Sequence, residues 1–409
     1  MGGGHLSKHR SASAGRRPHV LLLGGTSLAP LPAMRALKRE GARVTLGLAE
    51  DAWGPCRASR FADAVLRHPP LADGCALARC LAQAIPAIGA DIVMPMTDYA
   101  LLAIQPWRVE LERLAAVAAP PADCVALALD KGVTIERVRN SRAGMRIPRT
   151  ILPSSASDAA TMWQGPFPAL LKPRTGTGTI GVRIVRDAEE LRRAYQLVEE
   201  MHGPALVQEV IAYAPGDKFV LLYLFDNEGR LTCWCAQRVE RECRAVTVGL
   251  GKDRQRGGNA LLWGTSADDD LIERGVDLLR GLGWRGLCSV EGAFDRDGQP
   301  VLFEINPRLD GTGSLALSCG VNLVYDACLI ALGRPPRRHG ATRAGLRARK
   351  NLMTMIEARD LRAALAILDP RYRPPVPVRQ DPVPYLLEAW GIVRKRLPWR
   401  SRLAAAHRS

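Results

Sequence analysis

The stretch that decides the fold covers residues 291–308 and reads EGAFDRDGQPVLFEINPR. Two apolar segments flank Asp297-Gly298, a pair typical of a tight hairpin turn, so the stretch predicts two antiparallel strands. Side chains alternate between the two faces of a strand, which places Glu304, Asn306 and Arg308 on one face of the second strand. The hairpin therefore gathers an acid, an amide and an arginine on one surface.

The polar groups of this hairpin indicate a metal ion beside a phosphate. Glu291 lies on the first strand, where it can face the same side as Glu304 and Asn306. Mg²⁺ prefers carboxylate oxygens together with substrate phosphates. Arg308 offers a planar fork to phosphate or carboxylate oxygens. The alternative is a solvent-facing strand with incidental acids. We disfavour this alternative for two reasons. Carboxylates on an apolar hairpin are costly if they are buried without a partner, and further motifs lie upstream.

A lysine and a glycine-rich loop lie upstream, in the sequence LKPRTGTGTIGV of residues 171–182. Lys172 ends an apolar strand, and Thr177 and Gly178 lie in the loop that follows. Glycines let backbone N–H groups approach a phosphate, and hydroxyls add further donors. The loop is not a Walker A motif, because no Gly-Lys-Ser/Thr follows the glycines. Taken alone, an ordinary hairpin turn explains it equally well.

Three weaker signals accompany this loop. Gln208 and Glu209 end the apolar strand ALVQE, where backbone groups could meet an adenine edge and Glu209 could accept from ribose hydroxyls. Asp217 follows in a Pro-Gly turn, and its role is open. Lys131 lies near a helix start, where a lone lysine is usually solvated. None of these residues carries a function by itself.

The N-terminal part alternates between strand and helix patterns, which predicts a parallel α/β sheet. Ligands of such sheets lie beyond the carboxyl ends of the strands. Gly24–Ser27 and Thr97-Asp98 fall at that edge, but a dinucleotide-dependent reductase is disfavoured because the G-x-G-x-x-G pattern is incomplete. A tight turn explains the glycines as well as substrate binding does. The predicted elements are strands at 19–25, 42–47 and 92–96 and a helix at 32–40.

The composition limits the class of protein. The chain has 409 residues, which favours two or three domains with a buried core. No apolar run reaches the ~18 residues of a spanning helix, and no signal peptide is evident. Ten scattered cysteines indicate reduced thiols and a cytoplasmic protein. Cys233, Cys235 and Cys243 lack a clear fourth ligand for structural zinc, and we interpret them as ordinary thiols.

The formal charge of +16 is concentrated in residues 1–20, 331–350 and 391–409, and the rest of the chain is close to neutral. A basic chain raises the question of nucleic acid. These segments lack the aromatic residues that interleave with basic ones in a stacking groove. Nucleic-acid binding is therefore disfavoured, and solvated basic segments are the favoured explanation.

In this order the motifs resemble the ATP-grasp superfamily. The match runs from Lys131 to Lys172 and its glycine-rich loop, then to Glu209, and ends at Glu291 and Glu304-x-Asn306-Pro-Arg308. The sequence that follows resembles the carbamoyl-phosphate-synthase-like, carboxylate–amine ligase branch. The resemblance implies an α/β and α+β fold, with a Rossmann-like pre-ATP-grasp domain, a two-subdomain ATP-grasp fold and a basic C-terminal tail. The implied divisions are a disordered basic tail (1–17), the pre-ATP-grasp domain (18–119), the ATP-grasp domain (120–334, with a lid at 120–204 and a metal and substrate subdomain at 205–334) and a basic Pro-rich extension (335–409).

The resemblance also implies roles for the site residues. ATP and Mg²⁺ (or Mn²⁺) are the expected cofactors, and Arg308 and Asn306 the expected catalytic residues. A substrate carboxylate would attack the γ-phosphate to give an acylphosphate and ADP, and an amine would then displace phosphate. The expected ATP-binding residues are Lys131, Lys172, Thr177, Gly178, Gln208, Glu209 and Asp217, and the expected metal ligands are Glu291, Glu304 and Asn306.

Several alternatives stay open from the sequence. The chain could be an idle ATP-binding regulatory module, or it could use carboxylase-type chemistry through carboxyphosphate. The basic residues within 237–259 could border an acidic substrate or form a solvated loop. The aromatic and basic segment 385–400 suits a helix on a membrane surface, although packing on the body is favoured. The expected partners are a small carboxylate and an amine, and an oligomer is left open.

Overall fold

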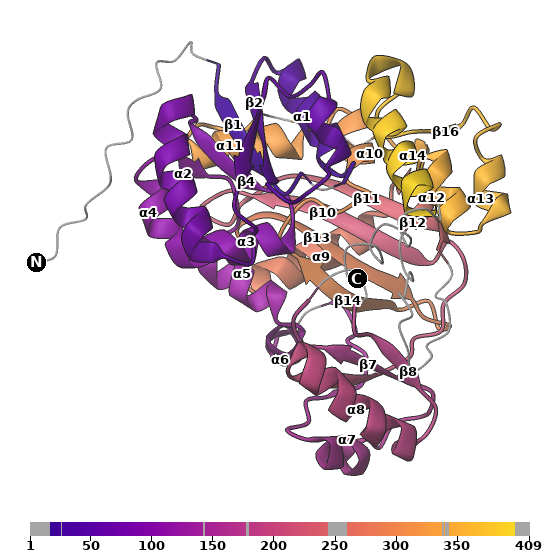
Figure 1. The fold of residues 1–409 in the computed structure, drawn as a ribbon. Coiled ribbons are helices and arrows are strands. Elements are labelled where there is room, and N and C mark those ends of the chain that lie inside the picture. Colours follow the sequence, from indigo (N-terminus) through magenta and orange to yellow (C-terminus); the bar gives the residue numbers. More distant parts are fainter. Residues whose placement is uncertain are drawn as a thin grey trace, which may run out of the picture.

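Three β-sheets organise the molecule, seen in a computed structural model that describes residues 17–25, 27–141, 144–176, 180–243, 260–337, 339 and 343–396. A five-stranded sheet forms the N-terminal domain, a seven-stranded sheet forms the centre, and a four-stranded sheet forms a projecting lid. Figure 1 shows the central sheet lying between the N-terminal domain and the lid. The fold class expected from the sequence is confirmed.

The N-terminal sheet is parallel, in the order β3-β2-β1-β4-β5. Its first strand, β1 (His19–Leu23), is buried along its whole length, as a strand covered on both faces should be. Gly24 adopts a positive φ of 106°, and a Cβ there would lie 3.0 Å from Thr97, so this glycine serves the turn. The other elements are α1 (Pro30–Arg39), β2 (Arg43–Ala49), η1 (Pro55–Ala58), β3 (Ala64–His68), α2 (Gly74–Ile88), β4 (Ile92–Pro95), α3 (Asp98–Ile104), η2 (Gln105–Trp107), α4 (Arg108–Glu112) and β5 (Ala116–Val117).

The lid sheet has the order β6-β9-β7-β8 and is covered by α7 and α8. Helix α8 (Ala188–His202) begins where Asp187 accepts a hydrogen bond from the Glu190 amide, and its buried residues recur every three or four positions. Strand β9 pairs with β6 and β7, so the expected division between 204 and 205 separates a strand from its own sheet. The lid elements other than α8 are β6 (Thr150–Ile151), α7 (Ala156–Met162), β7 (Ala169–Pro173), β8 (Arg183–Val185) and β9 (Ala205–Glu209). Before them, α5 (Ala122–Leu129) and α6 (Lys131–Arg139) pack against the core of the central sheet.

The central sheet runs β14-β13-β10-β11-β12-β15-β16. Strand β10 is buried along its whole length. One set of its side chains packs with helix α9, and the alternate set packs with α11. The elements are β10 (Lys218–Phe225), β11 (Leu231–Glu242), β12 (Ala260–Ser266), α9 (Asp269–Gly281), β13 (Gly286–Phe294), β14 (Pro300–Asn306), α10 (Ser314–Ser318) and α11 (Leu323–Ala331).

The C-terminal segment is integrated into the fold rather than appended to it. Two short strands, β15 and β16, extend the central sheet beyond β12. Helix α14 contacts η1 of the N-terminal domain, while Leu386 and Trp390 stay exposed. The possible membrane contact of this helix remains a prediction, and no described helix is long and apolar enough to span a bilayer. These elements are β15 (Arg347–Arg349), α12 (Leu352–Glu357), α13 (Leu361–Leu365), β16 (Tyr372–Arg373), η3 (Val378–Gln380) and α14 (Pro382–Arg396).

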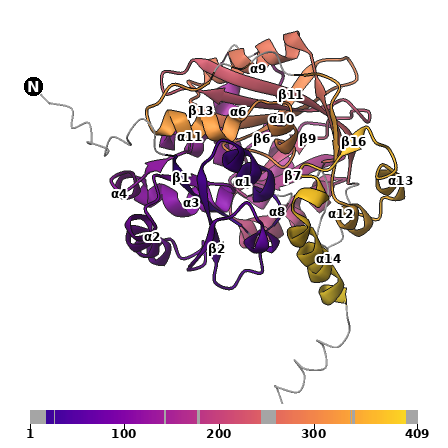
Figure 2. The same cartoon turned by 90° about the horizontal axis from the view of Figure 1, so that it is seen from above.

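The N-terminal domain and the central sheet share one hydrophobic core. Val20 and Leu37 of the N-terminal domain belong to the same buried cluster as Leu222 and Val324 of the centre. Figure 2 shows α1 and α11 close together between these two regions. The lid instead has a core of its own, formed by buried residues from 159 to 207.

Candidate active site

The hairpin of β13 and β14 brings the expected metal ligands together. Glu291 and Glu304 are direct cross-strand partners, a register that the sequence allowed but did not specify, and Arg308 lies two residues beyond the end of β14. Asn306 Nδ2 donates to Glu291 Oε1 at 3.0 Å and lies 3.5 Å from Glu304 Oε1. Two carboxylates and an amide thus share one partly buried surface. This donor set fits a hard divalent cation such as Mg²⁺.

The electrostatics of the hairpin also favour a cation. Burial, together with the nearby carboxylates of Glu304 and Asp310, raises the pKa of Glu291 to about 7. Lys218 and Arg308 act in the opposite direction on the same group. A divalent cation would offset the repulsion between Glu291 and Glu304 and would keep Glu291 deprotonated.

Lys218 is a site residue that the sequence analysis did not select. Its buried Nζ lies 2.9 Å from Glu242 Oε1 and 3.6 Å from Glu291 Oε2. Burial opposes the charge of Lys218, but Glu291 and Glu242 outweigh this effect and raise its pKa. The available signal was a lysine at the first position of the apolar strand KFVLLYLF. Such a residue needs a buried partner.

Arg308 reaches from the hairpin to the N-terminal domain. Its Nε and Nη2 donate to the two carboxylate oxygens of Asp98 at 2.7 and 2.8 Å. Asp98 begins α3, where Thr97 caps the helix at the carboxyl end of β4. The Thr97-Asp98 edge noted in the sequence is thus joined to the arginine that follows the β13–β14 hairpin (residues 286–306), called the metal hairpin below for its expected ligands. Burial opposes the charge of Arg308, but Asp98 raises its pKa overall.

Lys172 projects from β7 of the lid and is 7% exposed. Burial, aided by the charge of Lys131 and opposed by Glu304, lowers the pKa of Lys172 to about 8. The influence of Glu304 and Lys131 indicates that Lys172 lies near both the metal hairpin and the start of α6. Among the described residues, no carboxylate forms an ion pair with Lys172, and a buried lysine of this kind is suited to an anionic ligand.

Lys131 lies at the first turn of α6 beside the glycine-rich loop. Its Nζ donates to the Gly176 carbonyl at 2.9 Å. The neighbouring Asp130 forms a two-pronged ion pair with Arg174 at 3.0 and 2.8 Å, which fastens α6 to the end of β7. Thr177 and Gly178 lie outside the described residues.

The side chains of Gln208 and Glu209 have different surroundings, one inside the lid and the other at its border with the central sheet. Gln208 Nε2 donates to Thr150 Oγ1 at 2.9 Å within the lid, so only its backbone could meet a base. Glu209 forms an ion pair with Arg146, which also approaches Asp295 of the metal hairpin at 3.4 Å. Arg146 thereby links the lid strand β9 to the central sheet, a role with no motif in the sequence.

Asp217 serves a local turn. Its Oδ2 accepts a hydrogen bond from the Ala214 amide at 2.9 Å, which stabilises the loop before β10. The side chain that points toward Glu291 is the next one, Lys218. Of the basic residues expected to border a substrate pocket, Arg238 pairs with Asp268 and Arg241 pairs with Asp360. The others lie outside the described residues: Arg244, Lys252, Arg254 and Arg256.

Comparison with known proteins agrees with this geometry. Residues 234–353 match the family described as ATP-grasp in the biosynthetic pathway with Ter operon. The matched segment includes both strands of the metal hairpin. Over this segment the chain matches an ATP-grasp family. Its resemblance to that superfamily, inferred from the motifs, is confirmed.

One curated relative covers only part of the chain. The uncharacterized protein y4rH of Sinorhizobium fredii is 28% identical over 176 residues, which make up 40% of this chain and 32% of the relative. The chain therefore spans about a third of the length of that relative.

Solved structures share the fold at low sequence identity. Biotin carboxylase from Campylobacter jejuni aligns with a TM-score of 0.63 at 16% identity, over 80% of this chain and 74% of that one. L-amino acid ligase from Bacillus licheniformis aligns with a TM-score of 0.61 at 17% identity, over 81% and 79%. N5-carboxyaminoimidazole synthetase from Staphylococcus aureus aligns with a TM-score of 0.59 at 14% identity, over 78% of each chain.

Proposed function

We propose that this ATP-grasp protein is an ATP- and Mg²⁺-dependent ligase that joins a carboxylate to an amine and releases ADP and phosphate. The observation that carries the proposal is the paired Glu291 and Glu304, with Asn306 bridging them and buried Lys172 within electrostatic reach of Glu304. An idle binding module would have no need to retain this costly arrangement of buried charges.

The reaction would occur in two steps. An oxygen of the substrate carboxylate attacks the γ-phosphorus of ATP, the bond to the ADP oxygen breaks, and an acylphosphate forms. The amine nitrogen then attacks the acyl carbon, loses a proton and expels inorganic phosphate. Mg²⁺, held by Glu291, Glu304 and Asn306, would offset the charge of the transferring phosphoryl group.

The chain's own cations have separate tasks in this proposal. Lys172 and Lys131 would hold phosphate oxygens of ATP, which requires Lys131 to leave the Gly176 carbonyl. Arg308 would steady the substrate carboxylate and then the acylphosphate, with Asp98 fixing the plane of its guanidinium. Lys218 would keep Glu291 oriented. Glu209 would receive the ribose hydroxyls in place of Arg146.

The neighbours support ligase chemistry in a general way. One is named as an L-amino acid ligase, which favours an amino acid as a substrate. Another is named as a biotin carboxylase, which keeps carboxyphosphate chemistry as the second candidate. In that case bicarbonate would take the place of the organic carboxylate. Bicarbonate dependence therefore distinguishes the two reactions.

The test is phosphate release from Mg-ATP in the presence of pools of amino acids and small carboxylates, with and without added bicarbonate. Glu304→Ala is the inactive variant, and Asp297→Ala, in the turn of the same hairpin, is the matched control. We expect release that depends on a pool, yields ADP and disappears only in Glu304→Ala. Release of AMP would exclude the acylphosphate route. Tight ATP binding with no release from any pool would favour the idle module.

A further inference from the structure

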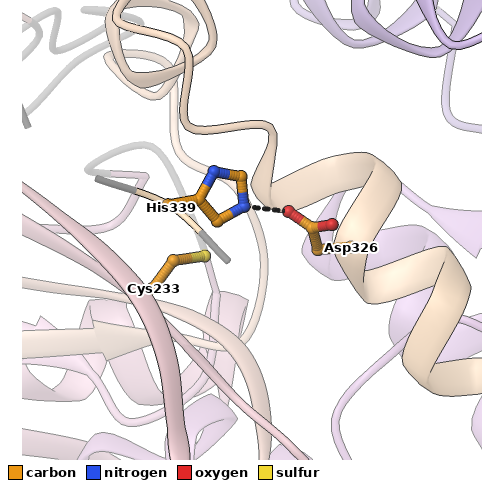
Figure 3. Close-up of side chains that lie close together, drawn as sticks. All are labelled: Cys233, Asp326 and His339. Carbon is orange, nitrogen blue, oxygen red and sulfur yellow. Dashed lines mark hydrogen bonds and ion pairs between the residues drawn. The ribbon is translucent and has the colours of Figure 1, made fainter. Parts of the chain in front are cut away.

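Three chemically different side chains meet on the side of the central sheet that faces the N-terminal domain. They are Cys233 of β11, Asp326 of α11 and His339, which follows α11 (Figure 3). Their sulfur, oxygen and nitrogen atoms all lie within 4.8 Å of one another. None of the three belongs to the proposed ATP site.

All three side chains are largely shielded from solvent. Asp326 is fully buried, Cys233 is 5% exposed, and the His339 side chain is 10% exposed. His339 Nε2 contacts one oxygen of Asp326, and Arg337 Nε donates to the other at 3.0 Å. No hydrogen bond to the Cys233 thiol is found among the described residues. The His339–Asp326 pair therefore accounts for two of the side chains and leaves the thiol unexplained.

The charges around the cluster do not balance by themselves. Arg337 is shared between two carboxylates, because its Nη1 also lies 2.7 Å from Glu40 Oε1. One guanidinium therefore faces both the fully buried Asp326 and the partly exposed Glu40. A divalent cation bound by a Cys233 thiolate adds one net positive charge, which neutralises the group. A protonated His339 would do the same without any metal, so the state of Cys233 distinguishes the two arrangements.

We propose that Cys233, Asp326 and His339 bind a thiophilic divalent cation of the zinc class, with a fourth position left for water. Thiolate, imidazole and carboxylate are the ligands that Zn²⁺ takes, and three protein ligands with a water in the fourth position form one of its usual coordination sets. Ligand atoms of a tetrahedral site lie roughly 3.5 Å apart, given metal–ligand bonds of about 2.0–2.3 Å. His339 Nε2 and Asp326 are in direct contact and would move apart to admit the cation, while the Cys233 sulfur, within 4.8 Å of both, would approach by up to about 1 Å.

The site would have a structural consequence. His339 belongs to the segment after α11, and Cys233 belongs to the central sheet. A cation between them would fasten this segment, which leads toward β15, onto the core shared with the N-terminal domain. Arg337, bound to Asp326 through both Nε and its backbone amide, would orient the carboxylate toward the metal.

The test uses the full-length protein after treatment with a chelator, titrated with Co²⁺. Co²⁺ bound to a thiolate gives a sulfur-to-metal charge-transfer band in the near ultraviolet. The proposed Mg²⁺ site contains no cysteine and cannot produce one. We expect one equivalent of Co²⁺ to generate this band, and Zn²⁺ to displace it. Cys233→Ser should abolish the band, and His339→Gln should weaken Co²⁺ binding at least ~10-fold.

Two controls make the outcome decisive. Cys235→Ser changes a buried thiol two residues along the same strand, and Glu304→Ala removes a ligand of the proposed Mg²⁺ site; both should keep the band. If Cys233→Ser does not fold, His339→Gln decides the matter, since it alters a residue outside the helices and strands. Absence of a thiolate band in the unmodified protein, or a band that survives both ligand substitutions, would overturn the proposal in favour of a His–Asp ion pair.

Discussion

The lid and the N-terminal domain both flank the central sheet, but they are attached to it differently. The N-terminal domain shares a continuous apolar core with β10, β11 and α11, whereas the lid closes a core of its own. Polar pairs such as Asp130–Arg174 and Arg146–Glu209 connect the lid strands to neighbouring segments. Separate cores allow separate motion. We therefore expect the metal hairpin to be fixed in place and Lys172 of the lid to move over the phosphates.

The largest expected effect is a loss of activity on changing a ligand of the metal hairpin, the part of the site that we expect to stay fixed. Glu304→Gln removes a metal-binding charge while keeping the shape of the side chain. We expect ADP release to fall by at least ~100-fold, because the second carboxylate alone holds the cation weakly. A coupled ADP assay measures the rate, and thermal unfolding checks that the fold is intact. The exposed Asp297→Asn, in the turn of the same hairpin, should stay fully active. Equal losses in both variants would contradict the assignment.

Lys218 of the central sheet and Lys172 of the lid are both buried, so substituting each by Met compares the two parts of the site. Lys218→Met leaves Glu291 and Glu242 without their cation and should lower the free energy of unfolding by about 2–4 kcal/mol. Lys172→Met removes a charge whose burial already lowers its pKa to about 8, so stability should hold or rise. ATP affinity should instead fall about 10-fold in Lys172→Met. Urea unfolding and nucleotide titration measure these two quantities. If Lys172→Met unfolds at a lower urea concentration than Lys218→Met, the proposed difference between the two lysines is wrong.

The Asp98–Arg308 ion pair, which links the N-terminal domain to the metal hairpin, is expected to contribute less to the free energy of unfolding than the Lys218 pairs do. Asp98→Asn leaves the largely buried Arg308 with a neutral partner and should cost about 1–3 kcal/mol. The apparent KM for the carboxylate substrate should rise more than kcat falls, since Arg308 loses its orientation. Asp63→Asn is the control, because its ion pair with Lys38 is exposed and should contribute less than about 1 kcal/mol.

The smallest expected effect is the pH dependence of stability in the absence of metal. Folding raises the pKa of Glu291 from 4.5 to about 7, so within that window the folded chain holds a proton that the unfolded chain has lost. The free energy of unfolding should therefore decrease as pH rises from about 4.5 to 7, on the order of 1–3 kcal/mol. Urea midpoints at pH 5 and pH 7.5 measure this slope. This slope should become smaller in Glu291→Gln, which has no carboxyl group to titrate, and in the presence of Mg-ATP.

Local sequence patterns predicted much of the structure of the metal hairpin. The alternation in residues 300–308 and the Asp297-Gly298 turn were enough to predict the hairpin, in which Glu291 and Glu304 lie opposite each other. Patterns failed where a residue looked typical of a motif but served another purpose. Asp217 stood near the expected acid position, yet its carboxylate holds a turn while Lys218 contacts Glu291. No periodicity reveals that difference, because it depends on which strand lies alongside β10.

The sequence by itself determined which residues share a face, which glycines allow tight turns, and that the chain has the ATP-grasp arrangement of lysines, loop and acidic hairpin. Only the tertiary structure decided which faces meet. Asp98 and Arg308 are 210 residues apart, and Cys233, Asp326 and His339 come from three separate segments. The reason is physical. Side-chain periodicity is set by the local backbone, whereas contacts between distant segments arise when apolar faces pack, and the packing carries the polar groups at their edges together.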